Sequence, residues 1–195
     1  QFLLDSAMEL RKMEFQYHPV FKNKTKDIRY RRLDIDGVGT AQFEGQTVLT
    51  IEDNVLIELT KAAITDVSHL LRPSHLAQLS TILRDKSASS NDHFVARQLL
   101  MNANVAANMI LPSCQDTGTA IVMGKKGQNV FTKGNDEEAI FKGVFQTYTE
   151  RNLRYSQMSP IDTYTEVNTK CNLPAQVTLL ATEGSSYEFL FVTKG

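Results

Sequence analysis

The junction between a helical pattern and a strand pattern in this chain is Leu111-Pro112-Ser113-Cys114-Gln115-Asp116-Thr117-Gly118-Thr119-Ala120. The segment brings a thiol, a carboxamide, a carboxylate and hydroxyl groups into one short stretch. Pro112 disfavours helical backbone at Leu111, so we expect the preceding helix to end just before the segment. Because rigid elements often carry functional groups on the loops that join them, this segment is the first candidate for a functional site.

Three helices are predicted before this segment. Asp53 or Asn54 should cap the first, and Arg72-Pro73 should end it and begin the second, since proline suits the first helical turn. Ser89-Ser90-Asn91 is a start signal for the third. Apolar residues recur at spacings of three and four, which predicts one buried stripe on each helix. The stripes are Leu56, Leu59, Ala63, Val67 and Leu70; Leu76, Leu79, Ile82 and Leu83; and Val95, Leu99, Ala103, Ala106 and Ile110.

Short strands are predicted on both sides of these helices. Residues 43–46 indicate a turn, and the β-branched residues 47–51 indicate a strand after it. Residues 119–123 indicate a buried strand. Gly124-Lys125-Lys126-Gly127 should form a turn that leads into a second strand at 128–131, so that the two strands form a hairpin. Both lysines should then be solvated. Near the end of the chain, 176–182 and 187–193 predict an antiparallel pair joined by 183–186.

A fourth helix should begin at Asn135-Asp136-Glu137-Glu138, because acidic residues in the first turn complement the helix dipole. Its expected core face is Ile140, Phe141, Val144, Phe145 and Tyr148. Helices and strands come in blocks, so we predict an α+β fold in which helices pack with short, mainly antiparallel strands. We expect residues 1–42 to form an N-terminal extension with the first strands, and residues 43–195 to form the main domain.

The composition is that of an ordinary globular protein, with 42% hydrophobic and 22% charged residues in 195. A net charge of −1 gives no global attraction to nucleic acid or anionic lipid, so the basic run from Lys22 to Arg32 is best explained as a solvated face. No apolar run reaches the roughly 20 residues that cross a bilayer, so neither nucleic acid nor a membrane is an expected partner. Two cysteines are too few for a disulfide framework, which favours a reducing compartment.

Cys114 allows three interpretations. In the first, it is a buried cysteine that acts as a small apolar residue, although Gln115 and Asp116 would then need hydrogen-bond partners. Alternatively, it is a catalytic thiolate with His69 or His93 as its base, although the adjacent Asp116 would raise rather than lower the pKa of the thiol. In the third interpretation it binds iron or an iron–sulfur cluster, where the metal itself favours the thiolate. The residues by themselves leave these alternatives open.

Residues 111–120 resemble the cluster-binding loop of the class I fumarate hydratases, the iron–sulfur fumarases. The likeness extends from about Phe43 to Gly195, and Ser113 stands where the family pattern has threonine. Several further motifs in the family's order argue against chance. They are Leu70-Leu71-Arg72-Pro73, Met123-Gly124-Lys125-Lys126-Gly127-Gln128, Asn152-Leu153-Arg154-Tyr155-Ser156-Gln157, Glu166-Val167-Asn168-Thr169 and Asn172-Leu173-Pro174-Ala175-Gln176.

This resemblance implies a hydro-lyase that hydrates fumarate reversibly to (S)-malate at a [4Fe–4S] cluster, whose open iron acts as a Lewis acid. Cys114 matches the first of the family's three cluster cysteines. Gln115 and Asp116 match residues that contact substrate, with Asp116 the candidate for acid–base catalysis, and Arg154 matches an arginine that holds a substrate carboxylate. The resemblance also implies a homodimer of the full-length protein, working in the tricarboxylic acid cycle in the cytoplasm or the mitochondrial matrix.

Cys114 is the one expected cluster cysteine in these residues, because Cys171 fits no cluster motif of the family and is best explained as a structural thiol. We therefore expect this chain to be the N-terminal part of a fumarase, with a catalytic domain that is incomplete at its C-terminal end and inactive alone. The alternatives are a related enzyme such as L-tartrate dehydratase, a non-catalytic fumarase-like module for interaction or iron sensing, and a thiol-nucleophile hydrolase.

Overall fold

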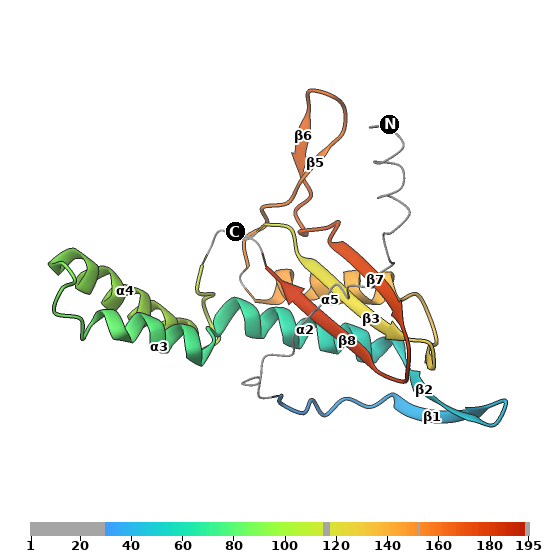
Figure 1. The fold of residues 1–195 in the computed structure, drawn as a ribbon. Coiled ribbons are helices and arrows are strands. Elements are labelled where there is room, and N and C mark those ends of the chain that lie inside the picture. Colours follow the sequence, from blue (N-terminus) through green and yellow to red (C-terminus); the bar gives the residue numbers. More distant parts are fainter. Residues whose placement is uncertain (1–29, 115–117, 152, 194–195) are drawn as a thin grey trace, which may run out of the picture. The chain divides into compact units, whose positions relative to one another are not determined.

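The computed structural model describes residues 30–114, 118–151 and 153–193. The chain divides into two compact units, Gln1–Leu33 and Asp34–Gly195, and all helices and strands described below belong to the second (Figure 1). The helices are α2 (Asp53–His69), α3 (Pro73–Ile82), α4 (Ser90–Ala106) and α5 (Asp136–Glu150). The strands are β1 (Val38–Phe43), β2 (Gln46–Ile51), β3 (Ile121–Gly127), β4 (Val130–Thr132), β5 (Met158–Pro160), β6 (Glu166–Asn168), β7 (Gln176–Thr182) and β8 (Tyr187–Val192). This mixture confirms the predicted α+β class.

The main core lies between α2, α5 and a three-stranded sheet of order β7-β3-β8 (Figure 1). The central strand β3 runs parallel to β7 and antiparallel to β8. Val122 of β3 is fully buried and packs in one cluster with Ile64 of α2 and Val144 of α5. Gly143 permits the close approach of the two helices, because a Cβ there would lie 2.6 Å from the Thr60 Cβ. Both helices therefore cover the same face of this sheet.

A second sheet has the order β1-β2-β4. Its hairpin turns at Glu44 and Gly45, as predicted, and both residues have positive φ angles of 48° and 78°, as a two-residue hairpin turn requires. β2 pairs in parallel with β4. A third, two-stranded sheet pairs β5 with β6 in the antiparallel sense.

The hairpin predicted at 124–127 is wrong. These residues continue β3, and β4 pairs with β2 instead. The predicted direct pairing of 176–182 with 187–193 is also wrong, because β3 lies between β7 and β8. β3 is the most buried of the three strands, and it takes the central position, where Val122 is flanked by Val177 and Phe191.

Lys126 is not the solvated turn residue that the hairpin prediction implies. Its Nζ donates to the Asp136 carboxylate at 2.8 Å and to the Thr132 hydroxyl at 2.6 Å. The Tyr187 hydroxyl also donates to Asp136, at 2.9 Å. Burial alone would raise the pKa of Asp136, but the hydrogen bonds from Lys126, Thr132 and Tyr187 outweigh it and hold that pKa below its usual value. The cluster ties the start of α5 to β3, β4 and β8.

The predicted helices exist, but their buried faces differ from the prediction in part. The N-cap position of α2 is Glu52 rather than Asp53 or Asn54, and the Glu52 side chain makes no capping hydrogen bond. The helix buries Leu56, Thr60, Ile64 and Ser68, while Val67 and Leu70 are exposed. α3 buries none of its residues. α5 buries Ile140, Val144 and Tyr148 as predicted, whereas Phe145 is exposed.

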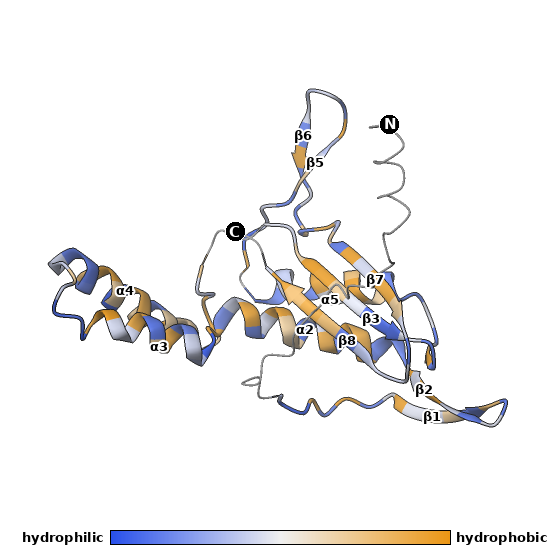
Figure 2. Ribbon diagram, in the orientation of Figure 1, coloured by the Kyte–Doolittle hydropathy of each residue, from blue (hydrophilic) through white to orange (hydrophobic). Residues whose placement is uncertain are grey.

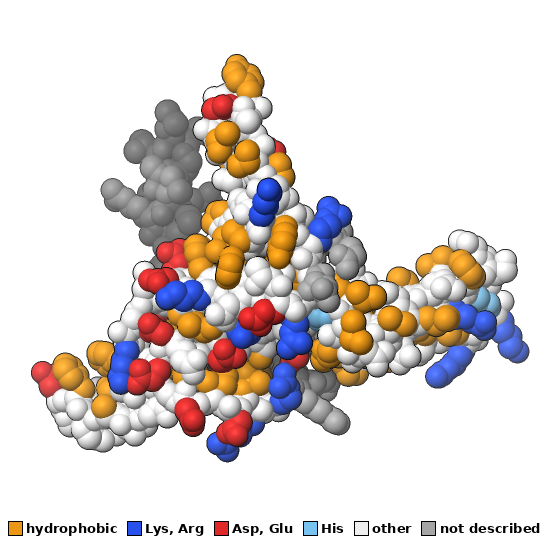
Figure 3. All heavy atoms as spheres, turned by 180° about the vertical axis from the view of Figure 1, so that it is seen from behind, with side chains coloured by type: hydrophobic (Ala, Val, Ile, Leu, Met, Phe, Trp, Pro, Cys, Tyr) orange, Lys and Arg blue, Asp and Glu red, His pale blue; other side chains and the backbone are white. Residues whose placement is uncertain are grey.

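α4 begins after Ser89, which forms a capping box with Asp92, so its start is confirmed. Its buried residues are small, namely Ala96, Ala103 and Ala106, and the predicted stripe residues Val95, Leu99 and Ile110 are exposed. Figure 2 shows apolar residues along this helix, and Figure 3 shows apolar side chains at the surface of the α3–α4 pair. α4 ends at Ala106, before the expected boundary at Leu111, and Met109 follows with a positive φ of 62°. No helix in the described ranges is long and apolar enough to cross a membrane.

Candidate functional site

The segment that carries Cys114 joins α4 to β3, as expected, and is fixed just before the cysteine. Both the amide and the hydroxyl of Ser113 donate to the Ser68 carbonyl, at 2.8 Å and 3.0 Å. The Asn102 side chain donates to the Ser113 carbonyl at 2.7 Å. Ser68 is buried in the last turn of α2, and Asn102 lies on α4. Two helices therefore hold the backbone at the residue that precedes Cys114.

Cys114 itself is exposed. The interpretation of Cys114 as a buried apolar residue is therefore wrong. Its exposure leaves the residue accessible to a ligand. Gln115 and Asp116, the other two predicted site residues of the segment, lie outside the described residues.

The segment is fixed again where it enters β3. The Ala120 carbonyl accepts from the Gln176 amide at 2.8 Å, and Ala120 is fully buried. The Thr119 hydroxyl donates to the Gln157 side-chain oxygen at 2.6 Å. The Gly118 carbonyl accepts from the Asn172 side chain at 2.8 Å. These three contacts come from the region after α5, so the segment is held between the helical half of the chain and its C-terminal third.

Arg154 lies in that C-terminal third, and its side chain is exposed. The preceding residue, Leu153, is buried in the main core and anchors the segment. The two residues after Tyr155 are held by Asn172, whose side-chain oxygen accepts from the Ser156 amide at 3.1 Å and the Gln157 amide at 2.9 Å. Asn172 thus joins the segment of Arg154 to the backbone that follows Cys114. The sequence motifs contained this residue, but no local pattern indicates its bridging role.

Two buried polar side chains lie on the helices beneath the sheet. The His69 ring is fully buried at the end of α2; its Nδ1 donates to the Thr65 carbonyl at 2.8 Å, and its Nε2 has no hydrogen-bond partner among the described residues. Burial raises the pKa of Tyr148, with the Asn172 amide acting in the opposite direction. His93, the other base considered for a thiol nucleophile, instead donates from Nε2 to the Asp85 carbonyl at 2.9 Å.

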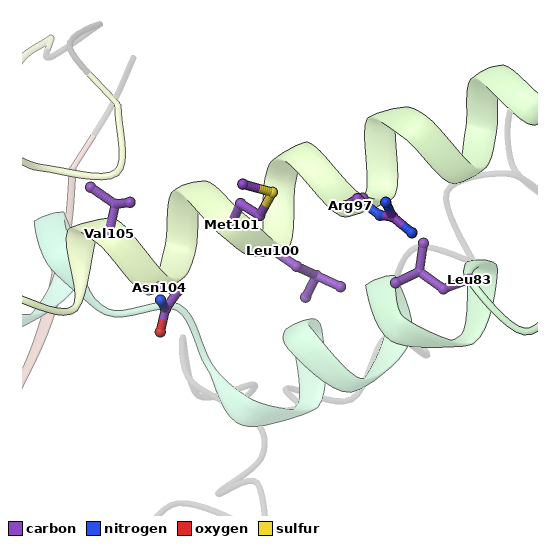
Figure 4. A pocket seen from close by; sticks show the side chains of 6 residues that line it. All are labelled: Leu83, Arg97, Leu100, Met101, Asn104 and Val105. Atoms are coloured by element: carbon purple, nitrogen blue, oxygen red, sulfur yellow. The ribbon is translucent and has the colours of Figure 1, made fainter.

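Among the described residues, no group of three or more His, Cys, Asp or Glu side chains is close enough to hold a metal ion. A shallow pocket of about 300 Å³ lies along α4 and is lined by Leu83, which directly follows α3, and by Arg97, Leu100, Met101, Asn104 and Val105 of α4 (Figure 4). None of the site residues predicted from the sequence lines it, so it is separate from the Cys114 segment.

Comparison with known proteins gives a consistent result. The family model described as fumarate hydratase (Fumerase) matches residues 57–195. The chain is 50% identical over 181 residues to the aerobic class I fumarate hydratase of Escherichia coli (strain K12), covering 93% of this chain and 33% of that protein. It is 48% identical over 185 residues to the mitochondrial fumarate hydratase 1 of Leishmania major, covering 93% of this chain and 34% of the relative. The chain therefore spans about a third of the length of these curated relatives.

Proposed function

The chain belongs to the fumarate hydratase (Fumerase) family, and from this premise we propose that the full-length protein is a hydro-lyase that converts fumarate and water reversibly into (S)-malate. The structural observation that carries the proposal is the link through Asn172, which joins the Arg154 segment to the backbone after Cys114. This link supports the proposal that two motifs far apart in the sequence contribute to one site. The names of the relatives support fumarate over tartrate as the substrate.

Arg154 binds one carboxylate of the substrate in this proposal. Its guanidinium group presents paired N–H donors that match the two oxygens of a carboxylate, which a lysine cannot do. Its exposure leaves it accessible to a small dianion. Gln115 donates to a carboxylate oxygen without adding charge, which suits a site that already contains cations.

Asp116 serves as the acid–base group. Dehydration of malate removes a weakly acidic C–H proton next to a carboxylate, and this step needs a base and a means of stabilising the developing charge. A carboxylate two positions after a cluster ligand reaches the same substrate. Asp116 holds the proton taken from carbon and returns it in the reverse direction.

Cys114 fits one ligand position of an iron–sulfur cluster. Its thiol is exposed, its backbone is fixed through Ser113, and thiolate is the ligand that such clusters require. The described residues offer no second and third ligand beside it, so the remaining cysteines come from the rest of the polypeptide. When bound, the cluster supplies a Lewis-acidic iron for the hydroxyl group and a carboxylate of the substrate.

The first test is the activity and metal content of the full-length protein. We expect fumarate hydration, followed by NMR, together with about four iron and four sulfide per chain after anaerobic purification. We expect no turnover from the isolated 195 residues. Little or no iron in an active enzyme would exclude the cluster, and turnover by the isolated chain would exclude its dependence on further ligands.

Asp116→Asn separates an enzyme from a non-catalytic module of the same family. The substitution keeps the size of the side chain but removes its ability to take a proton, so kcat should fall by about 100-fold or more while the iron content stays constant. An unchanged kcat would contradict the role of Asp116. Turnover of L-tartrate in excess of fumarate would replace the proposed substrate.

The remaining parts of the proposal concern assembly and setting. The full-length protein is a homodimer that acts in the tricarboxylic acid cycle, in the cytoplasm or the mitochondrial matrix. The support is the family resemblance and the mitochondrial name of one relative. Light scattering of the full-length protein tests the dimer, since a monomeric mass would contradict it.

A further inference from the structure

Asn172 is fully buried, and its side chain makes three hydrogen bonds to backbone groups that come from two distant segments. The side-chain nitrogen donates to the Gly118 carbonyl at 2.8 Å. The side-chain oxygen accepts from the amides of Ser156 and Gln157 at 3.1 Å and 2.9 Å. Because a carbonyl accepts and amides donate, these partners determine the orientation of the carboxamide.

The two segments that Asn172 joins are the two carriers of predicted site residues. Gly118 lies in the Cys114 segment, four residues after the cysteine, and Ser156 lies two residues after Arg154. A second, shorter bridge runs beside it, from the Thr119 hydroxyl to the Gln157 side chain at 2.6 Å. The Asn172 side chain is fully buried and its three backbone partners are half-buried, so water competes little for these bonds at the Asn172 end.

We propose that Asn172 is a positioning residue that sets the placement of the Arg154 segment relative to the Cys114 segment, and through it the placement of the substrate relative to the cluster. This inference rests on the proposed function. A reacting group displaced by about 1 Å can lose about 100-fold in rate, so a single buried carboxamide at this junction controls catalysis without contacting the substrate.

The backbone of Asn172 offers a way to separate positioning from local strain. Its φ is +58°, a conformation that asparagine, aspartate and glycine adopt more readily than other residues. Asn172→Gly therefore keeps the backbone and removes all three hydrogen bonds. Asn172→Asp keeps the acceptor for the two amides and, when ionised, removes the donor to Gly118, which cuts the bridge on one side.

The main experiment measures fumarate hydration by the full-length protein and its variants. We expect kcat/KM to fall by about 10- to 100-fold in both Asn172→Gly and Asn172→Asp, with iron and sulfide content unchanged. The matched control is Asn168→Ala, which also loses a bond to a backbone carbonyl, that of Tyr155, but has no contact with Gly118; its kcat/KM should stay within about twofold. Full activity in Asn172→Asp, or loss of the cluster in both variants, would overturn the proposal.

A double-mutant cycle tests whether Asn172 acts through Arg154. If it does, Asn172→Gly should cost little once Arg154→Ala has removed the guanidinium, so the two losses should combine to much less than their product. Losses that multiply fully would show that Asn172 acts on catalysis by another route, and would contradict the inference.

Amide hydrogen exchange separates failure of this inference from failure of the proposed function. In Asn172→Gly, exchange should become faster both at 156–157 and across 118–121, whether or not fumarate is the substrate. In Asn172→Asp, the amides at 156–157 should stay protected because their acceptor remains. Faster exchange at 156–157 with no change across 118–121 would show that Asn172 does not couple the two segments.

Discussion

The two helix pairs of this fold bury very different amounts of their apolar surface. α2 and α5 lie against the β7-β3-β8 sheet and bury Ile64, Ile140 and Val144 completely. α3 buries none of its residues, and α4 buries only three alanines. Both pairs are amphipathic in sequence, so the difference comes from whether another layer of the described residues covers the apolar face. Apolar periodicity therefore indicates a helix, but the neighbouring elements determine what that helix buries.

The largest difference in stability is expected between two side-chain truncations, one on α2 and one on α4. Ile64→Ala should lower the free energy of unfolding of the full-length protein by about 3 to 4 kcal/mol, because it leaves a cavity in a fully buried cluster. Leu99→Ala on α4 should cost about 1 kcal/mol or less, because 45% of Leu99 is already exposed. Denaturant titration measures both. A comparable loss for Leu99→Ala would show that the α4 face is covered in the full-length protein.

Gly143→Ala addresses the contact between α2 and α5. The new Cβ would lie 2.6 Å from the Thr60 Cβ and 2.8 Å from the Ile57 carbonyl oxygen, so the helices must separate, at a net cost of about 1 to 3 kcal/mol in unfolding free energy. Ala77→Val on the exposed side of α3 adds more volume but should cost less than about 1 kcal/mol. An unchanged midpoint of denaturation for Gly143→Ala would contradict the close packing of this pair.

Asp136, at the start of α5, makes the stability of the α2–α5 pair dependent on pH. Its folded-state pKa is lowered, so its contribution to stability is complete above its unfolded pKa of about 3.9 and is lost as the pH falls through the folded value. Asp136→Asn should therefore cost about 1 to 3 kcal/mol at pH 7, and the difference from the native protein should shrink below about pH 4. Unfolding measured from pH 7 to pH 3 tests this. A difference that stays constant with pH would show that the charge of Asp136 is not involved.

The smallest loss of stability is expected from removing a helix cap, and it should be about equal in α4 and α5. Ser89 caps α4, and Asn135 caps α5 by accepting from the amides of Glu137 and Glu138. Replacing either by alanine should cost about 1 kcal/mol, because a cap is a local interaction that does not depend on the layer above the helix. Circular dichroism during thermal unfolding measures the two losses. A much larger loss at one cap would show that capping is coupled to tertiary packing there.

In the candidate site, too, some features follow from consecutive residues and others from contacts between distant residues. The segment around Cys114, the Arg154 motif and their family resemblance can be read from consecutive residues. The anchoring of Ser113 by Ser68, and the bridge through Asn172, join residues 45 and 54 positions apart, and no local pattern contains that information.

What the sequence by itself determined is three of the helix starts, the turn of the first hairpin and the family. Helix starts at Pro73, Ser89 and Asn135 follow from backbone and capping chemistry within a few residues, and so does the turn at Glu44-Gly45. Only the tertiary structure decided that β3 lies between β7 and β8, that α4 exposes its apolar stripe, and that Asn172 joins two motifs. The physical reason is that strand partners and buried faces are selected by competition among distant segments for the same apolar contacts, whereas caps and turns are satisfied within one short stretch of backbone.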